Sequence, residues 1–308
     1  MLHNKKHSFI TLFIILFQIQ LGNAQANAVT VKTVQNQNNT IDFLYEKLKP
    51  GSYTIRIKFN RLENSSSSNI EKVIQNDFGL LYTLRPRDPN KPIGISYSVV
   101  NIPGNLKAKA DTLYTYLLPF KNGKKYKITQ NNDVKSTYFN KEKDSLFTSY
   151  AIRTATTDSI FAMRKGIVIQ VNQKELQTFN QKDLVYSSER HNIIIEHEDG
   201  TYARYIGLSA KSIKVKEGDI VYPTSYLGIS DVFNDEKHLF QFDLYYPDKA
   251  SNIIEKNHTI TYRHFKPFFH TAEGDLQLVY DKEHTAEVKK EYIITEMSKK
   301  EIKSFLKI

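Results

Sequence analysis

The sequence predicts an all-β protein, with an N-terminal β-sandwich-like domain, a second antiparallel β domain and a short C-terminal helix. Short runs rich in Tyr and Thr alternate between apolar and polar residues along the 308-residue chain. Turn residues such as Asp199 and Gly200 separate these runs at short intervals. Residues 283–308 differ, because their apolar residues recur at near-helical spacing between Lys and Glu.

Residues 1–24 are predicted to be a secretory signal peptide. Lys5 and Lys6 give a positive start, residues 9–21 form an apolar stretch, and small residues follow at 22–26. The alternative is an uncleaved membrane anchor, but the apolar stretch is short and interrupted by polar residues. We therefore expect an exported protein, in the periplasm or at the surface of a bacterium, with no transmembrane segment after signal cleavage.

The composition narrows the classes of partner and site. The sequence contains no cysteine, which excludes disulfides and thiolate zinc sites. The formal net charge of +10 favours acidic partners, such as cell-wall carboxylates, anionic sugars or lipid headgroups. The alternative is that most lysines simply solvate the strands. No nucleic-acid-binding motif is recognisable, so nucleic acid is not expected as a partner.

Residues 29–112 are expected to form the small β-sandwich. Residues 52–59 alternate after a turn at Pro50 and Gly51, and residues 79–84 and 95–100 are further strand-like runs. Residues 64–68 and 85–91 are polar connections. This domain contains no catalytic constellation. It either packs on the second domain or binds a partner, and packing is the expected role.

Residues 192–246 are the most regular part of the sequence. Residues 193–195 are a β-branched run, Asp199 and Gly200 make a hairpin turn, and residues 202–208 return as a strand. Two short strands around a turn at Gly218 follow. The last strand alternates, which places its side chains on two opposite faces. One face carries Leu239, Gln241, Asp243 and Tyr245, and the other carries Phe240, Phe242 and Leu244.

The order of these elements resembles the lysostaphin/LytM family of zinc metallopeptidases, which cut peptide crosslinks in bacterial cell walls. The shared frame comprises the hairpin, YIGL at 205–208, VKEGDIV at 215–221, LG at 227–228 and LFQFD at 239–243. Residues 114–130, YAIR at 150–153 and SIFAMRKGIVIQV at 159–171 extend the match to a Bacteroidetes-type branch. The resemblance covers residues 114–274 and implies a duplicated-hybrid-motif fold there.

The resemblance also indicates where a zinc site would lie, and the residues there are not zinc ligands. The family holds zinc with an upstream His, an Asp and the second His of an H-L-H segment, and two further histidines assist the attacking water. The matching positions here are Lys141, Arg153, Gly207, Leu239 and Gln241. Zinc sites use imidazole, thiolate or carboxylate ligands. The resemblance therefore implies a degenerate member that binds no zinc or other cofactor.

Other histidines offer an alternative zinc site. His238 immediately precedes the H-L-H position, but a one-residue shift in a strand turns a side chain to the opposite face. The histidines at 258, 264 and 270 are six residues apart, which is not a ligand spacing. An active enzyme with a relocated site would use His238, His191 or His197. We expect these histidines to be satisfied or exposed instead.

The remaining segments are polar loops and the tail. Residues 131–148 and 173–190 are expected to be surface loops, and the second could edge the groove. Residues 283–308 are predicted to be an amphipathic tail, helical from at least 295 onward. The tail either docks on the protein's own β surface or uses its lysines to contact a partner or a membrane surface.

The sequence therefore favours a catalytically inactive metallopeptidase-fold protein of the cell envelope, which binds cell-wall peptide or peptidoglycan or regulates a wall-cleaving partner protein. The expected binding groove contains Arg153, Tyr205 and Gln241, where a guanidinium would grip a peptide carboxylate. Arg153 could instead neutralise Asp243 or Glu142, and Tyr205 could serve hairpin packing. The alternative functions are a divergent zinc metalloendopeptidase that cleaves peptidoglycan crosslinks, and a purely structural envelope protein.

Overall fold

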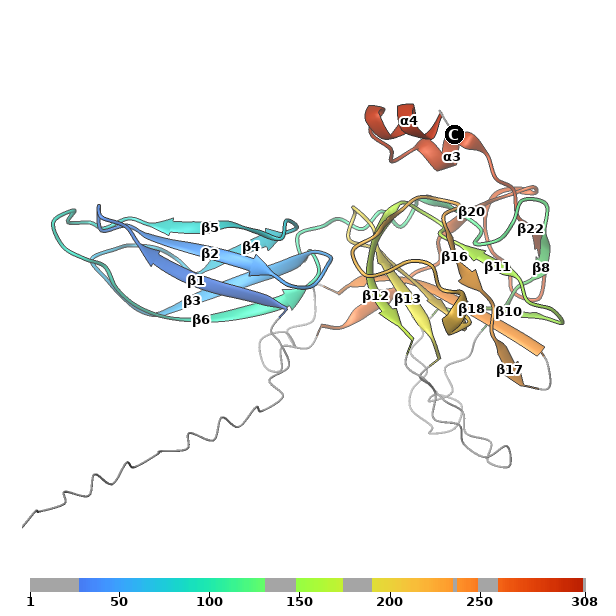
Figure 1. Cartoon of the computed structure of the whole chain (residues 1–308), viewed down its shortest axis with the longest axis horizontal. Coiled ribbons are helices and arrows are strands. Elements are labelled where there is room, and N and C mark those ends of the chain that lie inside the picture. The colour runs from blue at the N-terminus through green and yellow to red at the C-terminus, as the bar shows by residue number, and fades with distance from the viewer. Residues whose placement is uncertain (1–27, 131–147, 174–189, 235–236, 249–259, 307–308) are drawn as a thin grey trace, which may run out of the picture.

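The computed structural model describes residues 28–130, 148–173, 190–234, 237–248 and 260–306. Over these residues the protein is mostly β, with several antiparallel sheets and two short C-terminal helices, so the predicted all-β fold is confirmed. Two β bodies lie end to end, and the helices lie over the second one (Figure 1). No described helix has the length and apolarity needed to cross a membrane. The predicted signal peptide lies outside the described residues.

The first six strands form two three-stranded antiparallel sheets. One sheet has the order β1-β2-β5 and the other has the order β4-β3-β6. The strands are β1 (Val29–Gln35), β2 (Ile41–Lys47), β3 (Tyr53–Glu63), β4 (Ile70–Ile74), β5 (Phe78–Leu84) and β6 (Gly94–Pro103). β3, β5 and β6 contain the three runs predicted as strands, whereas β1, β2 and β4 are strands that the sequence analysis did not predict.

The facing sides of these two sheets bury a core of their own. Phe43 of β2 is fully buried and packs edge-on against Phe59 and Tyr97 of the opposite sheet. Ile55 and Ile57 of β3 also point inward. Apolar side chains at every second position explain why the run at 52–59 adopts a strand with one buried face.

A nine-stranded antiparallel sheet forms the centre of the second body. Its order is β15-β12-β13-β14-β18-β10-β9, and β17 and β19 also pair with β18. The strands are β9 (Thr129–Gln130), β10 (Tyr150–Thr154), β12 (Gly166–Asn172), β13 (Asn192–Glu196), β14 (Tyr202–Ile206), β15 (Ile220–Val221), β17 (Val232–Asn234), β18 (Lys237–Pro247) and β19 (Tyr262–His264). Gly200 makes the predicted hairpin between β13 and β14 with a φ of +79°.

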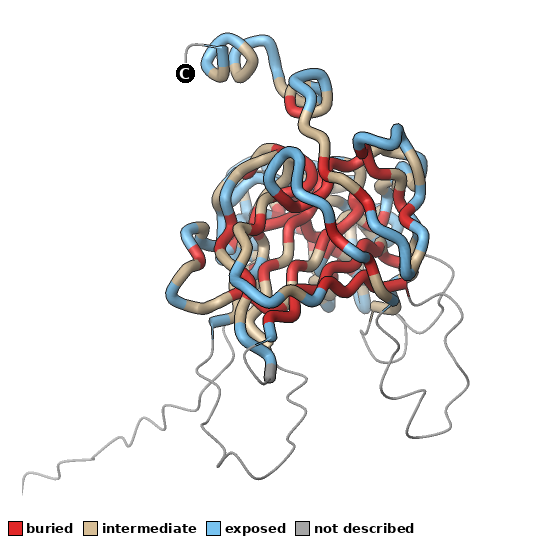
Figure 2. Tube along the Cα trace, turned by 90° about the vertical axis from the view of Figure 1, so that its right-hand side faces the viewer, coloured by how far each residue is buried: buried red, intermediate tan, exposed pale blue. Residues whose placement is uncertain are grey.

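β18 separates the core from an outer face, as its alternation predicts. Phe240, Phe242 and Leu244 lie in the core, where Phe242 stacks on Tyr150 with ring centroids 5.0 Å apart. The buried strands fill the interior of this body in Figure 2. Gln241 pairs with Ala151 of β10 and with Ile206 of β14, and directly paired residues share one face of a sheet. The outer face of β18 therefore continues onto both neighbouring strands.

Small sheets close the ends of this core. They pair β11 (Ser159–Phe161) with β16 (Tyr226–Ile229), β22 (Glu283–Thr285) with β8 (Lys125–Lys127), and β20 (Phe268–Thr271) with β21 (Gly274–Gln277) and β7 (Thr115–Leu117). Among the described strands, β7 and β20 form the one parallel pair. A 3-10 turn, η1 (Ala210–Ser212), precedes β15.

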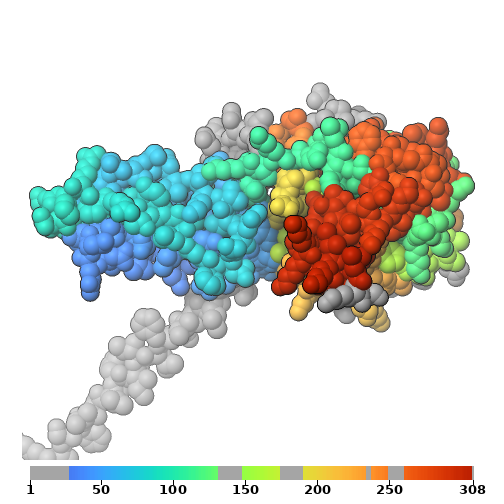
Figure 3. All heavy atoms as spheres, turned by 90° about the horizontal axis from the view of Figure 1, so that it is seen from above, coloured from blue at the N-terminus to red at the C-terminus, as the bar shows by residue number. Residues whose placement is uncertain are grey.

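The C-terminal tail contains two helices, α3 (Lys290–Ile294) and α4 (Lys299–Phe305), where a helix from 295 onward was expected. Ser298 caps α4: its hydroxyl accepts from the Glu301 amide at 3.3 Å, and the Glu301 carboxylate accepts from the Ser298 amide at 2.6 Å. This capping box starts a new helix at 299, so the helical tail is interrupted between α3 and α4. Seen from above, the tail covers part of the second body (Figure 3).

The two bodies meet where Glu196 of β13 reaches the residues before β3. The Glu196 carboxylate accepts hydrogen bonds from the Ser52 hydroxyl and from the Ser52 amide, the latter at 2.8 Å. Tyr202 donates to the same carboxylate at 3.4 Å. Gly51 has a φ of +89°, and a Cβ there would collide with Glu196. The first body is therefore attached through a buried carboxylate.

Candidate functional site

The positions that the resemblance assigns to the zinc site come together on the outer face of the central sheet. Arg153 lies opposite Leu239 in the β10–β18 register, and Gln241 follows two residues later on the same face. Gly207 comes directly after β14, whose Ile206 lies opposite Gln241. Arg153, Gly207, Leu239 and Gln241 therefore lie close together, with Arg153 exposed and the other three buried, and we call this set of positions the groove. Lys141, the fifth position, lies outside the described residues.

The Arg190 guanidinium occupies the space beside Gly207. It donates from Nη1 to Gln241 Oε1 at 3.2 Å and from Nη2 to the Leu239 carbonyl. Its Cζ also lies 5.2 Å from the centre of the Phe233 ring. Gly207 has a φ of +85°, and a Cβ there would collide with this guanidinium and with the Leu239 carbonyl. A cation therefore lies beside the position that the resemblance assigns to a catalytic histidine.

Arg153 adds a second guanidinium to the groove. Its side chain is exposed, and Nη1 donates to the Thr129 hydroxyl at 3.3 Å. It does not neutralise Asp243, because that carboxylate is fully buried and paired with Arg204 at 2.6 Å. Glu142, the other acidic partner considered for Arg153, lies outside the described residues. The groove therefore presents Arg153 to solvent.

Tyr205 does not belong to the groove. It lies opposite Phe242 in the β14–β18 register, on the core face, and it is completely buried. Its hydroxyl accepts a hydrogen bond from the Met163 amide at 2.9 Å, and burial raises the pKa of the phenol. Because strand neighbours alternate between faces, Tyr205 serves the packing of the core and the predicted site set loses this member.

The three histidines considered for a relocated zinc site bind three different backbone carbonyls. The Nδ1 atoms of His191, His197 and His238 lie 3.2 Å from Leu208 O, 2.8 Å from Lys165 O and 3.3 Å from Ser230 O, respectively. His238 is buried and lies two residues before Phe240 on the same, core-facing side of β18. Within the described ranges, no group of three His, Cys, Asp or Glu side chains could hold a metal ion.

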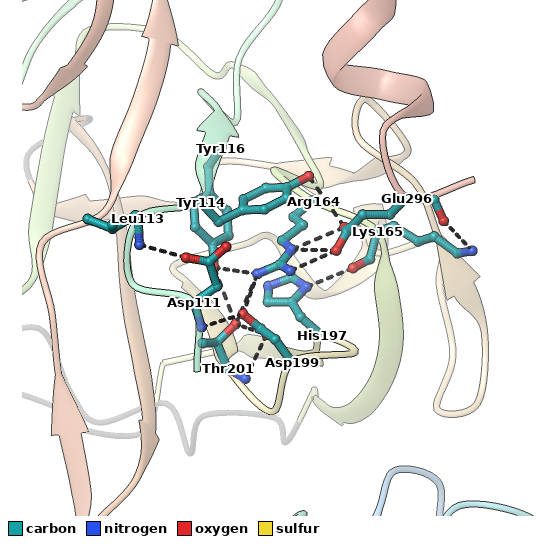
Figure 4. A network of polar contacts seen from close by, with 10 residues as sticks. All are labelled: Asp111, Leu113, Tyr114, Tyr116, Arg164, Lys165, His197, Asp199, Thr201 and Glu296. Carbon is teal, nitrogen blue, oxygen red and sulfur yellow. Dashed lines mark hydrogen bonds and ion pairs between the residues drawn. The ribbon is translucent and has the colours of Figure 1, made fainter. Parts of the chain in front are cut away.

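A second polar centre, which the sequence analysis did not identify, surrounds Arg164 (Figure 4). Arg164 has only 3% of its side chain exposed, and it binds Glu296 of the tail at 2.7 Å and Asp199 of the hairpin at 2.9 Å. Its Cζ lies 3.7 Å from the centre of the Tyr114 ring, and Nη1 donates to the Tyr116 hydroxyl at 3.1 Å. In the sequence, this centre could have been noticed from Arg164, because it is a charged residue within the apolar run at 159–171.

This centre holds the tail in place. Burial alone would lower the pKa of Arg164, but its hydrogen bonds to Glu296 and the nearby negative charges raise it, so the guanidinium stays charged. Lys165 donates to the Glu296 carbonyl at 2.9 Å and to Glu301 at 3.0 Å, and Tyr222 donates to Glu301 at 2.6 Å. Arg164 and Lys165 are paired with Asp199, Glu296 and Glu301, so the geometry of this centre indicates attachment of the tail.

No protein-family model matches the sequence, and no curated protein matches it either. Among solved structures, the chain is similar to one in the SpoIIQ-SpoIIIAH pore forming complex, with 16% identity, 46% of this chain and 99% of that chain covered, and a TM-score of 0.27. It is similar to the M23 metalloprotease pseudoalterin from the deep sea, with 16% identity, coverage of 54% and 99%, and a TM-score of 0.29. It is also similar to a zinc containing peptidase from Vibrio cholerae, with 11% identity, coverage of 71% and 75%, and a TM-score of 0.30. The structural likeness to M23-type peptidases is therefore distant.

Proposed function

We propose that this protein is a non-hydrolytic envelope protein with a metallopeptidase-like fold, and that its groove binds the peptide part of peptidoglycan. The observation that carries the proposal is the position of the Arg190 side chain. Its guanidinium lies against Gly207, Leu239 and Gln241, three of the positions that the resemblance assigns to zinc chemistry. A permanent cation there opposes binding of Zn²⁺ and favours binding of an anion.

The groove suits a peptide carboxylate. Arg153 is exposed beside Leu239, and a guanidinium can bind a carboxylate through two parallel hydrogen bonds. Free carboxylates occur along the stem peptides of bacterial cell walls. Occupying such peptides would also regulate a wall-cleaving partner, because the bound peptide is withheld from the enzyme. This role requires export of the protein to the periplasm or cell surface, in keeping with the predicted signal peptide.

The first experiment measures binding of soluble wall fragments to wild-type protein and to Arg153→Ala. The variant should lose about 1.5–3 kcal/mol of affinity, the range for a hydrogen bond to a charged group. This loss should shrink as added salt screens the ion pair. Arg61→Ala is the matched control, because Arg61 is an exposed arginine of the first body and its removal changes the net charge equally. Equal affinities of wild type and Arg153→Ala would contradict the proposed groove.

The second experiment tests the absence of hydrolysis. Purified protein incubated with Zn²⁺ and dialysed should retain far less than one zinc per chain, and it should release no crosslink fragments from peptidoglycan. Cleavage that a chelator stops, and that is abolished by substituting His191, His197 or His238, would establish the metallopeptidase alternative instead.

A further inference from the structure

A cavity of about 380 Å³ lies at the junction of the two bodies, on the same sheet face as the groove. β18 connects the two places: Gln241 lines the groove, and Tyr245, four residues further along the same face, lines the cavity. That spacing corresponds to roughly 13 Å along a strand. The first body closes the cavity with residues around the start of β3 and the end of β6, namely Pro50, Gly51, Ser52, Tyr53, Pro103 and Gly104.

The second body lines the cavity with tyrosine rings. Tyr202 and Tyr245 stack with centroids 5.4 Å apart and planes at 16°, and both are buried. Tyr262 of β19 stands edge-on to both, with centroids 6.1 Å and 5.1 Å away. Tyr262 is nevertheless 42% exposed. The packed pair thus holds Tyr262 in place while part of its ring surface stays open to a ligand.

Polar groups beside the rings have largely balanced charges. Arg204 lines the cavity and binds Asp243 at 2.6 Å through Nη2 and at 3.2 Å through Nε. Asp243 is completely buried, whereas the Arg204 side chain is 34% exposed. The Glu196 carboxylate, also in the wall, accepts from Ser52 and Tyr202. The charge of Arg204 is offset by the buried Asp243 and by Glu196, so the cavity offers no excess positive charge to an anionic ligand, in contrast to the groove.

We propose that this cavity binds an uncharged sugar ring of a glycan strand. Sugar rings present C–H groups that pack on an aromatic face, and hydroxyls that pair with guanidinium, carboxylate and phenol groups. The volume lies near the lower end of the range for small-ligand pockets, which suits roughly one or two sugar rings. The inference rests on the proposed function in one respect: a sugar in the cavity and its attached peptide in the groove would be bound together.

The test uses separate probes for the two places. A tetramer of β-1,4-linked N-acetylglucosamine carries no peptide, and a free wall stem peptide carries no sugar. Binding of each is measured by NMR titration with wild-type protein and with Tyr262→Ala, Tyr262→Phe and Tyr82→Ala. Tyr82 is a partly exposed tyrosine of the first body, so its removal controls for loss of an aromatic surface.

The tetramer should bind wild-type protein and shift signals of residues that line the cavity, such as Arg204 and Tyr262. Tyr262→Ala should weaken its binding about tenfold, as expected for removal of a packing ring, whereas Tyr262→Phe and Tyr82→Ala should retain it. Stem-peptide binding should be unchanged by Tyr262→Ala. Retained folding of each variant is checked by the dispersion of its NMR spectrum.

Absence of tetramer binding, or equal binding by wild type and Tyr262→Ala, would overturn the sugar site. If the stem peptide still bound in an Arg153-dependent manner, the proposed function would stand without it. If the tetramer bound as expected and the stem peptide did not bind, the sugar site would stand and the peptide groove would fail. A stem peptide whose signals shift at the cavity, and not at the groove, would assign the cavity to peptide and overturn the inference.

Discussion

Position 207 has no room for a side chain. Gly207 adopts a φ of +85°, and a Cβ would meet both Arg190 and the Leu239 carbonyl. The glycine and the arginine therefore depend on one another, because the guanidinium fills the space that the missing side chain leaves. A histidine introduced at position 207 alone would displace Arg190.

Gly207→Ala should lower the free energy of unfolding by roughly 2–3 kcal/mol, since it combines backbone strain with overpacking. Gly218→Ala is the matched control. Gly218 has a φ of +95°, but no atom lies within 4 Å of the position its Cβ would take, so only the strain applies. Urea denaturation of both variants separates the two effects. Equal losses of stability would mean that Arg190 moves aside without cost.

His197 should make stability depend on pH. Burial, and then the charge of Arg164, lower the pKa of His197 to about 3. In the unfolded chain the pKa is about 6.5, so below that pH the unfolded state binds a proton that the folded state does not. Stability should therefore fall as the pH drops from about 6.5 towards 3, by at most about 1.4 kcal/mol per pH unit.

His197→Asn keeps a donor for the Lys165 carbonyl but does not titrate. Urea denaturation curves at several pH values between about 7 and 5 should show a smaller loss of stability for the variant than for wild type, because the histidine contribution is gone. Parallel pH profiles of the two proteins would show that His197 binds its proton equally in both states.

At the residue scale, the sequence pattern located the positions of the groove, but it did not identify Arg190, which fills the space beside Gly207. Arg153, Leu239 and Gln241 were identified because their spacing matches a known motif. Arg190 lies at the end of a hydrophilic segment predicted as a loop, and no local pattern indicates that its side chain folds back onto β18. Tyr205 was misplaced although strand alternation alone assigns it to the core face.

At the scale of elements, the tail shows that a helix cap can decide where a helix begins even when the apolar spacing continues across it. Apolar spacing predicted one helix, but Ser298 and Glu301 form a capping box that starts α4 anew. The break leaves Glu296 between the helices, where it reaches Arg164. Glu301 is the second carboxylate that attaches the tail. Several hydrogen bonds lower its pKa to about 2, and the one from Tyr222 has the largest effect, so Glu301 is charged at neutral pH.

Glu296→Gln should loosen the tail. The change leaves Arg164, which is 3% exposed, with a single carboxylate partner, and breaking a buried ion pair costs roughly 3–5 kcal/mol. Hydrogen exchange of the α3 and α4 amides should accelerate strongly. Glu291→Gln changes the net charge of the tail equally but lies at an exposed position, and it should leave exchange unchanged. Equal exchange in both variants would mean that apolar contacts, such as buried Ile293, hold the tail.

At the scale of the whole molecule, hairpins and alternating strands were predictable because they depend on neighbours in sequence. The order of the nine-stranded sheet was not, because β18 pairs with β10, from which it is separated by more than eighty residues. The contact that joins the two bodies could not be predicted from the sequence either. Ser52 and Glu196 lie 144 residues apart, and neither belongs to a recognisable motif.

That joint should decide whether the two bodies move as one. Each body has its own buried core, so either can stay folded when the contact is lost. Glu196→Ala removes the acceptor of the Ser52 and Tyr202 hydrogen bonds, and the contact should weaken by about 1.5–3 kcal/mol.

NMR relaxation should then report faster tumbling of the first body, while both bodies keep dispersed spectra. Glu63→Ala, at an exposed site of β3, should tumble like wild type. A single unchanged tumbling time in Glu196→Ala would show that the remaining contacts, including the ion pair of Lys49 with Glu217 at 3.4 Å, suffice to hold the bodies together.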